Sequence, residues 1–303
     1  MLGKNLHLRG VICTLLGGVA WGFSGACGQF LTQNANISSS LITFLRMFFA
    51  GIILLGISFI KKRKRAVDIL KNKKTVLGLL SFGVFGLLIS QFTYIKAIFH
   101  SNAGTATVLQ YLGPVLIMIF VCIKTRRFPK LNEFISVILA FGGVLVLATG
   151  LDFSKLLLSK ECLFWGIAAA VGLVFYSLIP KKLLKIYDAI EVTGYGMLFG
   201  SVILFFMVRP WQEEIVFNLY TFLAVSGMVV VGTVFAYTMY IRGVGDIGAV
   251  KASMLACIEP VCATVFSCLW FGTRFKMVDI LGFVMILSTV FLLGIERKTP
   301  KNL

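Results

Sequence analysis

Long apolar runs separated by short polar segments constrain this chain more than any other feature. A helix of about 20 apolar residues crosses the hydrocarbon core of a bilayer. Only 14% of the 303 residues are charged and 58% are hydrophobic, whereas a soluble domain carries about 25% charged residues. The alternation expected of a membrane β-barrel is absent. The sequence therefore predicts an all-α polytopic membrane protein with ten transmembrane helices, at about residues 9–30, 38–60, 76–97, 102–123, 132–150, 161–180, 190–208, 218–241, 248–270 and 277–295.

The basic residues lie mainly in the segments between these runs. The net charge is +17, and the clusters read KKRKR (61–65), KNKK (71–74), KTRRFPK (124–130) and PKKLLK (180–185). With a cytoplasmic N-terminus and ten alternating spans, 21 of the 29 Lys and Arg residues fall inside and five fall outside. This positive-inside bias predicts that both termini lie in the cytoplasm. We expect a multi-pass protein of the bacterial plasma (inner) membrane. The basic clusters then face the anionic surface of the lipid bilayer, and no nucleic-acid partner is expected.

The sequence lacks the motifs that several classes of chemistry require. The seven cysteines contain no CxxC pair, and the two histidines, His7 and His100, form no HExxH motif. We therefore expect no disulfide framework, no metal site and no cofactor. No GxxxxGK[ST] motif occurs, so ATP hydrolysis is not expected either. The first run lacks an A-x-A-like cleavage site and is interpreted as a span rather than a signal peptide.

An internal repeat relates the two halves of the chain. The segment YIKAIFHSNAGTATVLQYLGP (94–114) aligns without gaps with YIRGVGDIGAVKASMLACIEP (240–260). Tyr94 falls on Tyr240 and Pro114 on Pro260 in this alignment.

The repeat predicts two five-helix units, at residues 9–150 and 161–296. Because five is an odd number, the two units enter the membrane in opposite orientations. Inverted repeats of this kind are typical of secondary transporters. Two glycine spacings, Gly18-x-x-x-Gly22 and Gly196-x-x-x-Gly200, predict close helix packing.

Four short motifs carry a resemblance to a known family. They are AWGFSG (20–25), FLRMFFAG (44–51), QYLGPV (110–115) and CIEPV (257–261). With the five-plus-five plan, they make the chain similar to the EamA-type ten-helix carriers of the drug/metabolite transporter superfamily. In the second half, the AWG motif is degraded to VFYS (174–177).

The resemblance implies two inverted five-helix repeats around a central cavity. It implies that spans 1, 3, 4, 6, 8 and 9 line this cavity, whereas spans 5 and 10 lie at the periphery. It further implies transport of small metabolites, often amino acids or toxic amphiphiles, without ATP hydrolysis.

Glu259 is the candidate whose position within an apolar run most needs an explanation. It lies near the middle of the ninth run, where an ionisable group costs about 2.5–3.5 kcal/mol on insertion scales. Pro260 removes a backbone donor, so a carbonyl of the preceding turn is free to bind a ligand or a water. Glu259 is therefore a candidate for binding a substrate amine or for proton coupling. The structural alternative is a carboxylate that caps or pairs with a neighbouring helix.

Three basic residues also fall inside spans. For Lys96 and Lys251 the alternatives are snorkelling to the interface or facing the cavity. Arg46 can bind a substrate carboxylate, pair with Glu259 or stabilise helix ends. Because span 2 is not a principal cavity wall in the family, a structural role for Arg46 is favoured.

Uncharged polar and aromatic residues, together with the two prolines, complete the predicted substrate site. For each alone, packing or interface anchoring is the alternative. As a set they suit an amphiphilic or aromatic solute. With Glu259, the candidates are Trp21, Ser24, Gln91, Tyr94, Thr105, Gln110, Tyr111, Pro114, Tyr176, Tyr237, Tyr240 and Pro260.

The leading functional hypothesis is a secondary, non-ATP exporter of a small-molecule substrate, an amino acid or an amphiphile, working by alternating access. Proton coupling through Glu259 is one form of it. The alternatives are a multidrug or toxic-compound carrier and a nucleotide-sugar-like carrier. GVGD (243–246) with YD (187–188) also matches part of the pattern of intramembrane aspartyl proteases. A receptor or scaffold is the remaining functional class. Apart from the protease-like motifs, the sequence indicates no catalytic residue. The oligomeric state is open.

Overall fold

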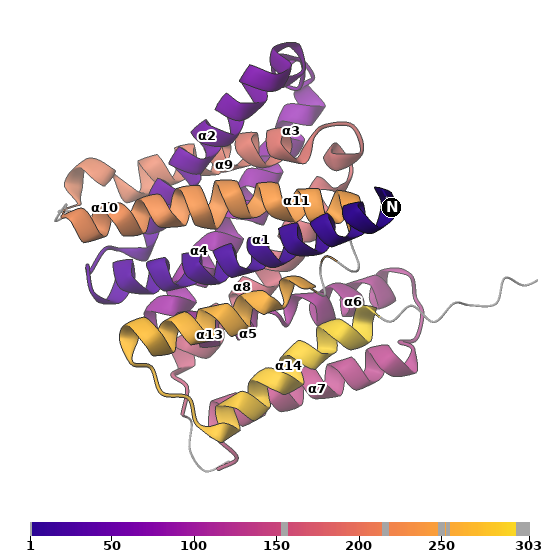
Figure 1. Ribbon diagram of the computed structural model, residues 1–303, viewed down its shortest axis with the longest axis vertical. Coiled ribbons are helices and arrows are strands. Elements are labelled where there is room, and N and C mark those ends of the chain that lie inside the picture. Colours follow the sequence, from indigo (N-terminus) through magenta and orange to yellow (C-terminus); the bar gives the residue numbers. More distant parts are fainter. Residues whose placement is uncertain (1, 153–156, 214–217, 248–251, 253–254, 295–303) are drawn as a thin grey trace, which may run out of the picture.

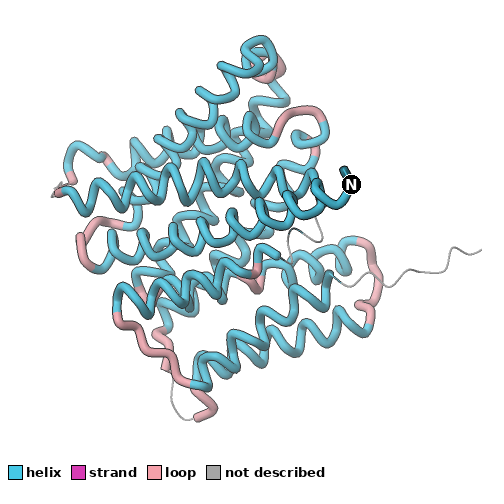
Figure 2. Tube along the Cα trace, viewed as in Figure 1, coloured by secondary structure: helices cyan, strands magenta, loops and turns pink. Residues whose placement is uncertain are grey.

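The computed structural model describes residues 2–152, 157–213, 218–247, 252 and 255–294. Within these residues the chain forms only helices and connecting loops (Figure 2). The helices lie side by side in one bundle, with the pair α7 and α14 at one edge (Figure 1).

The first half contains five spans. One of them includes a π-helical segment, and another is broken into two α-helices. They are α1 (Leu2–Gln33), α2 (Ser39–Asp68), the continuous run of α3 (Lys73–Ser81), η1 (Phe82–Leu88) and α4 (Ile89–Phe99), the pair α5 (Ala103–Gln110) and α6 (Gly113–Lys124), and α7 (Leu131–Thr149). The segment η1 is a π-helix.

The second half repeats this plan. It contains α8 (Lys160–Leu178), α9 (Ala189–Val208), the run of α10 (Leu219–Ser226), η5 (Gly227–Phe235) and α11 (Ala236–Ile247), then α13 (Ile258–Phe271) and α14 (Met277–Gly294). Short 3-10 turns occur at η2 (Ile179–Lys181), η3 (Leu183–Lys185) and η4 (Pro210–Gln212).

The described helices have the lengths that a membrane protein requires. Eight of them are long and apolar enough to cross a bilayer, and two shorter apolar helices lie at Ile258–Phe271 and Met277–Leu293. All ten predicted runs are therefore helical where the structure describes them, and the chain is an all-α polytopic membrane protein.

The prediction that residues 61–75 form a loop between the second and third runs is largely wrong. The backbone of α2 stays helical through Asp68, which leaves a short turn before α3. Lys and Arg are good helix formers, so the basic cluster that ends the span extends the helix. Asn72 then caps α3 by accepting a hydrogen bond from the Lys74 N–H over 2.9 Å.

The two halves share their irregularities as well as their spans. At the spacing that places Tyr94 on Tyr240, the π-helix η1 corresponds to residues 228–234, which lie inside the π-helix η5. The fourth span breaks between α5 and α6 directly before Pro114, and α13 begins two residues before Pro260. Proline cannot donate the helical hydrogen bond, so each proline stands in the first turn of a new helix.

Packing between spans mixes the two repeats. α1 packs against η5, α11 and α13, and the equivalent helix α8 packs against η1, α4, α5 and α6. We call the first set (α1, η5, α11 and α13) group X and the second set (α8, η1, α4, α5 and α6) group Y. The repeat relates each helix of one half to its equivalent in the other half, and so it relates group X to group Y. The remaining equivalent helices pack on each other, α2 on α9 and α7 on α14.

Glycines allow the closest helix contacts. A Cβ atom at Gly22 would lie 2.7 Å from Cys262 Cβ and 2.9 Å from the Glu259 carbonyl oxygen. Similarly, a Cβ at Gly200 would lie 2.8 Å from the Gly83 carbonyl oxygen. Both predicted glycine spacings therefore hold helices close, α1 on α13 and α9 on η1.

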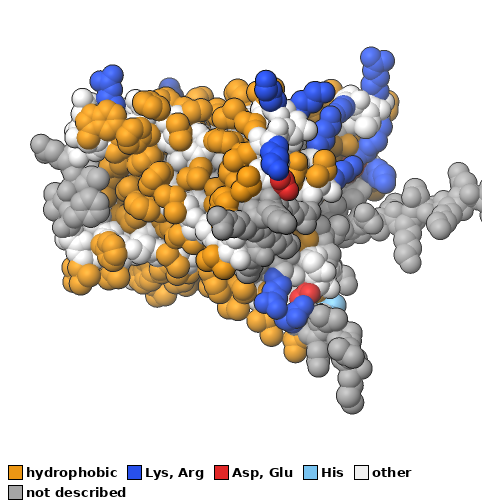
Figure 3. Space-filling model, turned by 90° about the horizontal axis from the view of Figure 1, so that it is seen from above, with side chains coloured by type: hydrophobic (Ala, Val, Ile, Leu, Met, Phe, Trp, Pro, Cys, Tyr) orange, Lys and Arg blue, Asp and Glu red, His pale blue; other side chains and the backbone are white. Residues whose placement is uncertain are grey.

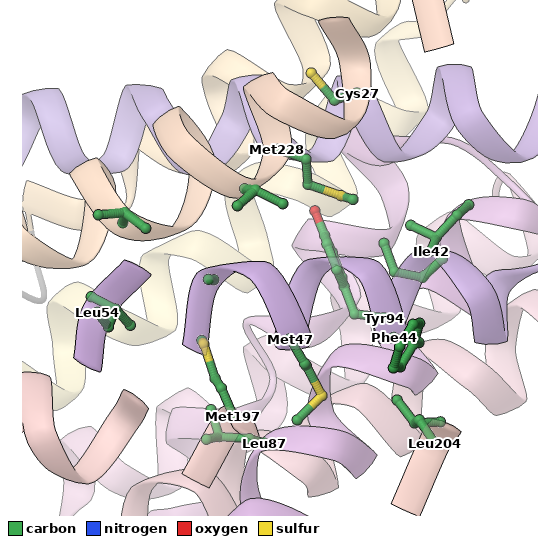
Figure 4. Packing of buried hydrophobic residues seen from close by; sticks show 14 of the residues in the cluster. Cys27, Ile42, Phe44, Met47, Leu54, Leu87, Tyr94, Met197, Leu204 and Met228 are labelled. Carbon is green, nitrogen blue, oxygen red and sulfur yellow. The ribbon is translucent and has the colours of Figure 1, made fainter. Parts of the chain in front are cut away.

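The main hydrophobic core lies between α2, α9 and the helices of both groups. Met47, Met197 and Leu204 gather there between α2 and α9 (Figure 4). Many large apolar side chains are also exposed, including Phe49 and Ile52 on α2, and they give the molecule an apolar outer surface (Figure 3). Exposed apolar area of this extent fits a surface in contact with lipid.

Candidate functional site

A cavity of about 500 Å³ lies between groups X and Y. Residues from both repeats line it, and its lining is more apolar than polar. Near the amino-terminal face, where α1 begins, the lining reaches Ser177 and Leu293, each next to the end of its helix. The lining residues are Trp21, Ser24, Arg46, Leu87, Ser90, Gln91, Tyr94, Gln110, Tyr111, Pro114, Ile117, Leu173, Tyr176, Ser177, Tyr237, Tyr240, Ala256, Glu259, Val290 and Leu293.

The structure brings most of the predicted site residues to this cavity. Eleven of them line it: Trp21, Ser24, Gln91, Tyr94, Gln110, Tyr111, Pro114, Tyr176, Tyr237, Tyr240 and Glu259. Thr105 is buried in the first turn of α5 and does not reach it. Pro260 is buried in α13, outside the lining.

Of the two predicted in-span lysines, Lys96 is not among the residues that line the cavity. The Lys96 Nζ atom lies 5.9 Å from the centre of the Phe92 ring and 5.8 Å from that of Phe99. This contact is a cation–π interaction, so Lys96 is held at the end of α4 away from the lining. Lys251 lies outside the described residues.

Glu259 and Tyr111 connect the two helix breaks. The Tyr111 hydroxyl lies 3.1 Å from Glu259 Oε2 and 3.0 Å from the Ala256 carbonyl oxygen, and both can accept its proton. Ala256 is the residue whose carbonyl the missing N–H of Pro260 would have bonded in a continuous helix. Pro260 leaves the Ala256 carbonyl without its helical hydrogen bond. This carbonyl instead accepts a hydrogen bond from Tyr111 of the other repeat.

Arg46 lines the cavity, so span 2, which was not expected to be a principal cavity wall, contributes a residue to it. Its Nε donates a hydrogen bond to Thr233 Oγ1 over 3.0 Å, and that hydroxyl donates to the Met228 carbonyl over 3.0 Å. Thr233 and Met228 both belong to the π-helix η5. The wider turn of η5 exposes the carbonyl that anchors Thr233, and α2 packs on η5 with its Arg46 face.

Aromatic rings form much of the remaining wall. Trp21 packs on Tyr237 with ring centres 5.6 Å apart and on Tyr240 at 5.0 Å. Tyr176 from α8 of group Y and Tyr237 from α11 of group X also line the cavity. Rings of this kind present apolar faces and polar edges to a solute.

Two lining residues have buried polar atoms that lack a partner among the described residues. These atoms are Ser24 Oγ and Gln91 Oε1. An unsatisfied buried polar atom costs about 1–3 kcal/mol, so both positions favour a bound solute or water.

A hydrogen-bond network around Gln29, here called the Gln29 network, joins the two packing groups near the opposite face, where α1 ends. Gln29 Oε1 accepts from the Ala103 N–H and from Ser267 Oγ, both over 2.9 Å. Gln29 Nε2 donates to Gln33 Oε1 over 3.1 Å, and Gln33 Nε2 donates to the Ser101 carbonyl over 2.8 Å. The network joins α1 and α13 of group X to α5 and the end of α4 of group Y.

Sequence reasoning did not find this network. Its signal was available, because two amides four residues apart interrupt an apolar run in QFLTQ (29–33). The apolar or small lining residues were also missed, and the sequence held no signal for them: Leu87, Ser90, Ile117, Leu173, Ser177, Ala256, Val290 and Leu293. The last two lie on α14, so span 10 pairs with α7 at the edge and still contributes to the cavity wall.

The two aspartates of the protease-like motifs have other roles. Asp246 accepts hydrogen bonds from Arg9 Nε over 2.8 Å and Arg9 Nη2 over 2.7 Å. Asp188 caps α9 by accepting from the Ile190 N–H over 3.1 Å. Neither lines the cavity, and in the described residues no group of His, Cys, Asp and Glu is arranged to hold a metal ion.

Comparisons with known proteins agree with this architecture. The model of the EamA-like transporter family matches residues 8–149 and again residues 160–295. The uncharacterized inner membrane transporter YicL of Salmonella typhimurium is 36% identical over 290 residues, which cover 96% of each chain. The uncharacterized transporter YetK of Bacillus subtilis is 24% identical, over 92% of this chain and 84% of its own. A solved crystal structure aligns with 95% of this chain and 97% of its own, with a TM-score of 0.60 and 16% identity, which shows a shared fold alone.

Proposed function

Since the chain belongs to the EamA-like transporter family and is a multi-pass inner-membrane transporter, we propose that it exports small metabolites by alternating access, as a secondary carrier and not as an enzyme. The resemblance inferred from the four sequence motifs is thereby confirmed. The cargo class that we propose is amino acids or amphiphilic compounds, carried through the central cavity.

One observation carries this proposal. The cavity lies between two packing groups that are related by the repeat, its lining extends to Ser177 and Leu293 near the amino-terminal face, and the hydrogen bonds of Gln29 join the two groups near the opposite face. A carrier needs a central site with access to one face at a time. Breaking the bonds between groups X and Y on one face and forming others on the amino-terminal face would exchange that access.

The proposed orientation places the amino-terminal face in the cytoplasm. Lys and Arg side chains gather at the end where α1 begins, at the right in Figure 3, and the positive-inside rule assigns such an end to the cytoplasm. The cavity then takes cargo from the cytoplasm while the Gln29 network holds the outer face closed.

Glu259 is the proposed coupling residue. It is the one carboxylate among the described residues that line the cavity, it is half-buried, and its hydrogen-bond partner Tyr111 comes from the other repeat. A carboxylate at this position can hold a proton or the amine of a cargo molecule, but not both together. Competition between the two would link outward transport of an amine to inward movement of a proton.

Flux measurements in proteoliposomes test the proposal. Wild type, Glu259→Gln and Glu161→Gln are compared at several pH values, Glu161 being an exposed carboxylate in the first turn of α8. We expect Glu259→Gln to lose the pH dependence of flux and Glu161→Gln to keep it. Equal pH dependence in all three proteins would remove Glu259 from the coupling mechanism.

The aromatic lining supports a second cargo class, amphiphilic drugs. A thermal-shift screen against amino acids, amphiphilic cations and sugar nucleotides separates the candidates, because a ligand that binds the folded state raises its apparent stability. Stabilisation by sugar nucleotides alone would contradict both of the favoured classes.

A further inference from the structure

We propose that Arg46 binds an anionic group of the cargo, so that the cavity selects solutes that carry a carboxylate or a similar anion. This inference rests on the proposed carrier function and names the substrate class of the same cavity. It is carried by the burial of Arg46, by the contacts of its guanidinium group and by the groups that surround it.

Arg46 is deeply buried but not enclosed by polar partners. The residue is 8% exposed, and its one hydrogen bond in the described part of the chain runs from Nε to Thr233 Oγ1. No hydrogen bond of the terminal nitrogens Nη1 and Nη2 is found in the described part of the chain, and Arg46 is one of the residues that line the cavity.

No carboxylate of the described residues forms an ion pair with Arg46. Glu259 is the acid of the cavity lining, and it interacts with Arg46 electrostatically. The ion pairs found in the described residues do not include one between them. A charged group in the membrane interior without a counter-ion is costly, so the site favours an anion brought in by a ligand.

The anchoring of Arg46 prepares it for this role. The bond from Nε to Thr233 fixes the plane of the guanidinium group, and Thr233 is itself held by the Met228 carbonyl. A guanidinium presents its terminal N–H groups as a planar fork that matches the two oxygens of a carboxylate. With the Nε edge taken by Thr233, the Nη edge is left for the ligand.

The rest of the lining fits a solute that has an apolar body beside its anionic group. Tyr94 and Tyr237 lie near Arg46, and Trp21 packs on Tyr237. In the same cavity, Glu259 can accept a hydrogen bond from a cationic group. A zwitterion with an aromatic or apolar side chain satisfies both charges, and an amphiphilic cation satisfies only Glu259.

A purely structural role for Arg46 makes a different prediction. If Arg46 served only to hold η5 through Thr233, its removal would lower stability and weaken every ligand equally. Removal of Thr233 would then have the same effect. An anion-binding role instead predicts a loss that depends on whether the ligand carries a carboxylate.

Three phenyl ligands separate these possibilities. Phenylalanine carries both charges, 3-phenylpropanoate carries the carboxylate alone, and phenethylamine carries the amine alone. Affinities are obtained from thermal shifts of the purified full-length protein, for wild type, Arg46→Gln, Arg46→Lys and Thr233→Val. We expect Arg46→Gln to bind 3-phenylpropanoate and phenylalanine at least about tenfold more weakly, equivalent to about 1.4 kcal/mol, and to bind phenethylamine no more weakly than wild type does.

Two variants keep the test decisive if Arg46→Gln does not fold. Thr233→Val retains the guanidinium and should keep the preference for the carboxylate. Arg46→Lys retains the charge but not the fork, so it should weaken carboxylate binding alone. Equal binding of 3-phenylpropanoate by wild type and the Arg46 variants would overturn the inference, as would a wild type that binds phenethylamine and neither carboxylate.

Flux in proteoliposomes separates this inference from the carrier proposal. Wild type that transports phenethylamine but binds neither carboxylate contradicts the role of Arg46 and leaves the carrier function standing. Wild type that binds the carboxylates through Arg46 but moves none of the three ligands contradicts the carrier proposal instead.

Discussion

The hydroxyl of Tyr111 lies 3.1 Å from the carboxylate of Glu259, and the two residues stand at the matching helix breaks of the two repeats. In the alignment of the repeats, Tyr111 corresponds to Cys257 and Glu259 corresponds to Gly113. The repeat has therefore kept its backbone break in both halves while placing a phenol in one and a carboxylate in the other. Because of this asymmetry, Glu259 has no acidic counterpart at Gly113, and the described cavity lining holds a single acidic residue.

Tyr111→Phe should destabilise the protein moderately. The substitution removes the donor to Glu259 and to the Ala256 carbonyl, and interhelical hydrogen bonds in membranes contribute about 0.5–2 kcal/mol. Thermal unfolding in detergent measures the effect. Tyr240→Phe is the control, because Tyr240 lines the same cavity and no side-chain hydrogen bond of its hydroxyl is found in the described residues. A larger loss in Tyr240→Phe than in Tyr111→Phe would contradict the assignment.

Gln29→Leu should open the face that the Gln29 network closes. The variant loses the bonds to Ala103 and Ser267 that join the two packing groups, and a cost of about 1–2 kcal/mol changes the population ratio about 5- to 30-fold. Access is measured with Ser24→Cys in a background without native cysteines, by adding an impermeant maleimide from each side of the membrane. We expect labelling to shift toward the face where α1 ends.

Thr32→Val is the matched control for this experiment. Thr32 is also buried near the end of α1, but its hydroxyl donates only to carbonyls of its own helix, at Gly28 and Gln29. It should leave the labelling pattern unchanged. An equal shift in both variants would mean that α1 itself, and not the contact between the groups, controls access.

Gly232→Ala should destabilise the bundle, whereas Gly245→Ala in the same span should not. A Cβ at Gly232 would clash with the Ser24 side chain across the contact of η5 with α1, and a Cβ at Gly245 would meet nothing within 4 Å. Overpacking costs about 1–3 kcal/mol, and Ala is favoured over Gly in a helix by about 1 kcal/mol. Thermal unfolding of the two variants measures the difference. Similar stability for both would show that the contact of Ser24 with Gly232 can adjust.

The sequence predicted the spans and much of the cavity for the same physical reason. Polar and charged side chains such as Gln91 and Glu259 are costly in lipid, so their presence in apolar runs indicated that they face an interior. Apolar lining residues such as Leu87 and Leu173 carry no such signal, because they suit lipid, core and cavity equally.

The position of Arg46 could not be predicted, because it depends on how α2 is rotated about its axis. The π-helices add a second limit. Each wide turn holds an extra residue and rotates the following face of the span, so the spacing of polar residues along the third and eighth runs does not follow one helical period. Tyr94 and Tyr237 come after such turns, and only the structure shows which way they face.

Because each packing group takes helices from both repeats, neither repeat can be an independent folding unit. A chain cut between Gly150 and Lys160 would yield an amino-terminal fragment whose α1 lacks the α11 and α13 surfaces it normally contacts, and a carboxyl-terminal fragment whose α8 lacks α4. When the two fragments are co-expressed, they should associate and restore the folded bundle. When either fragment is expressed alone, it should be degraded.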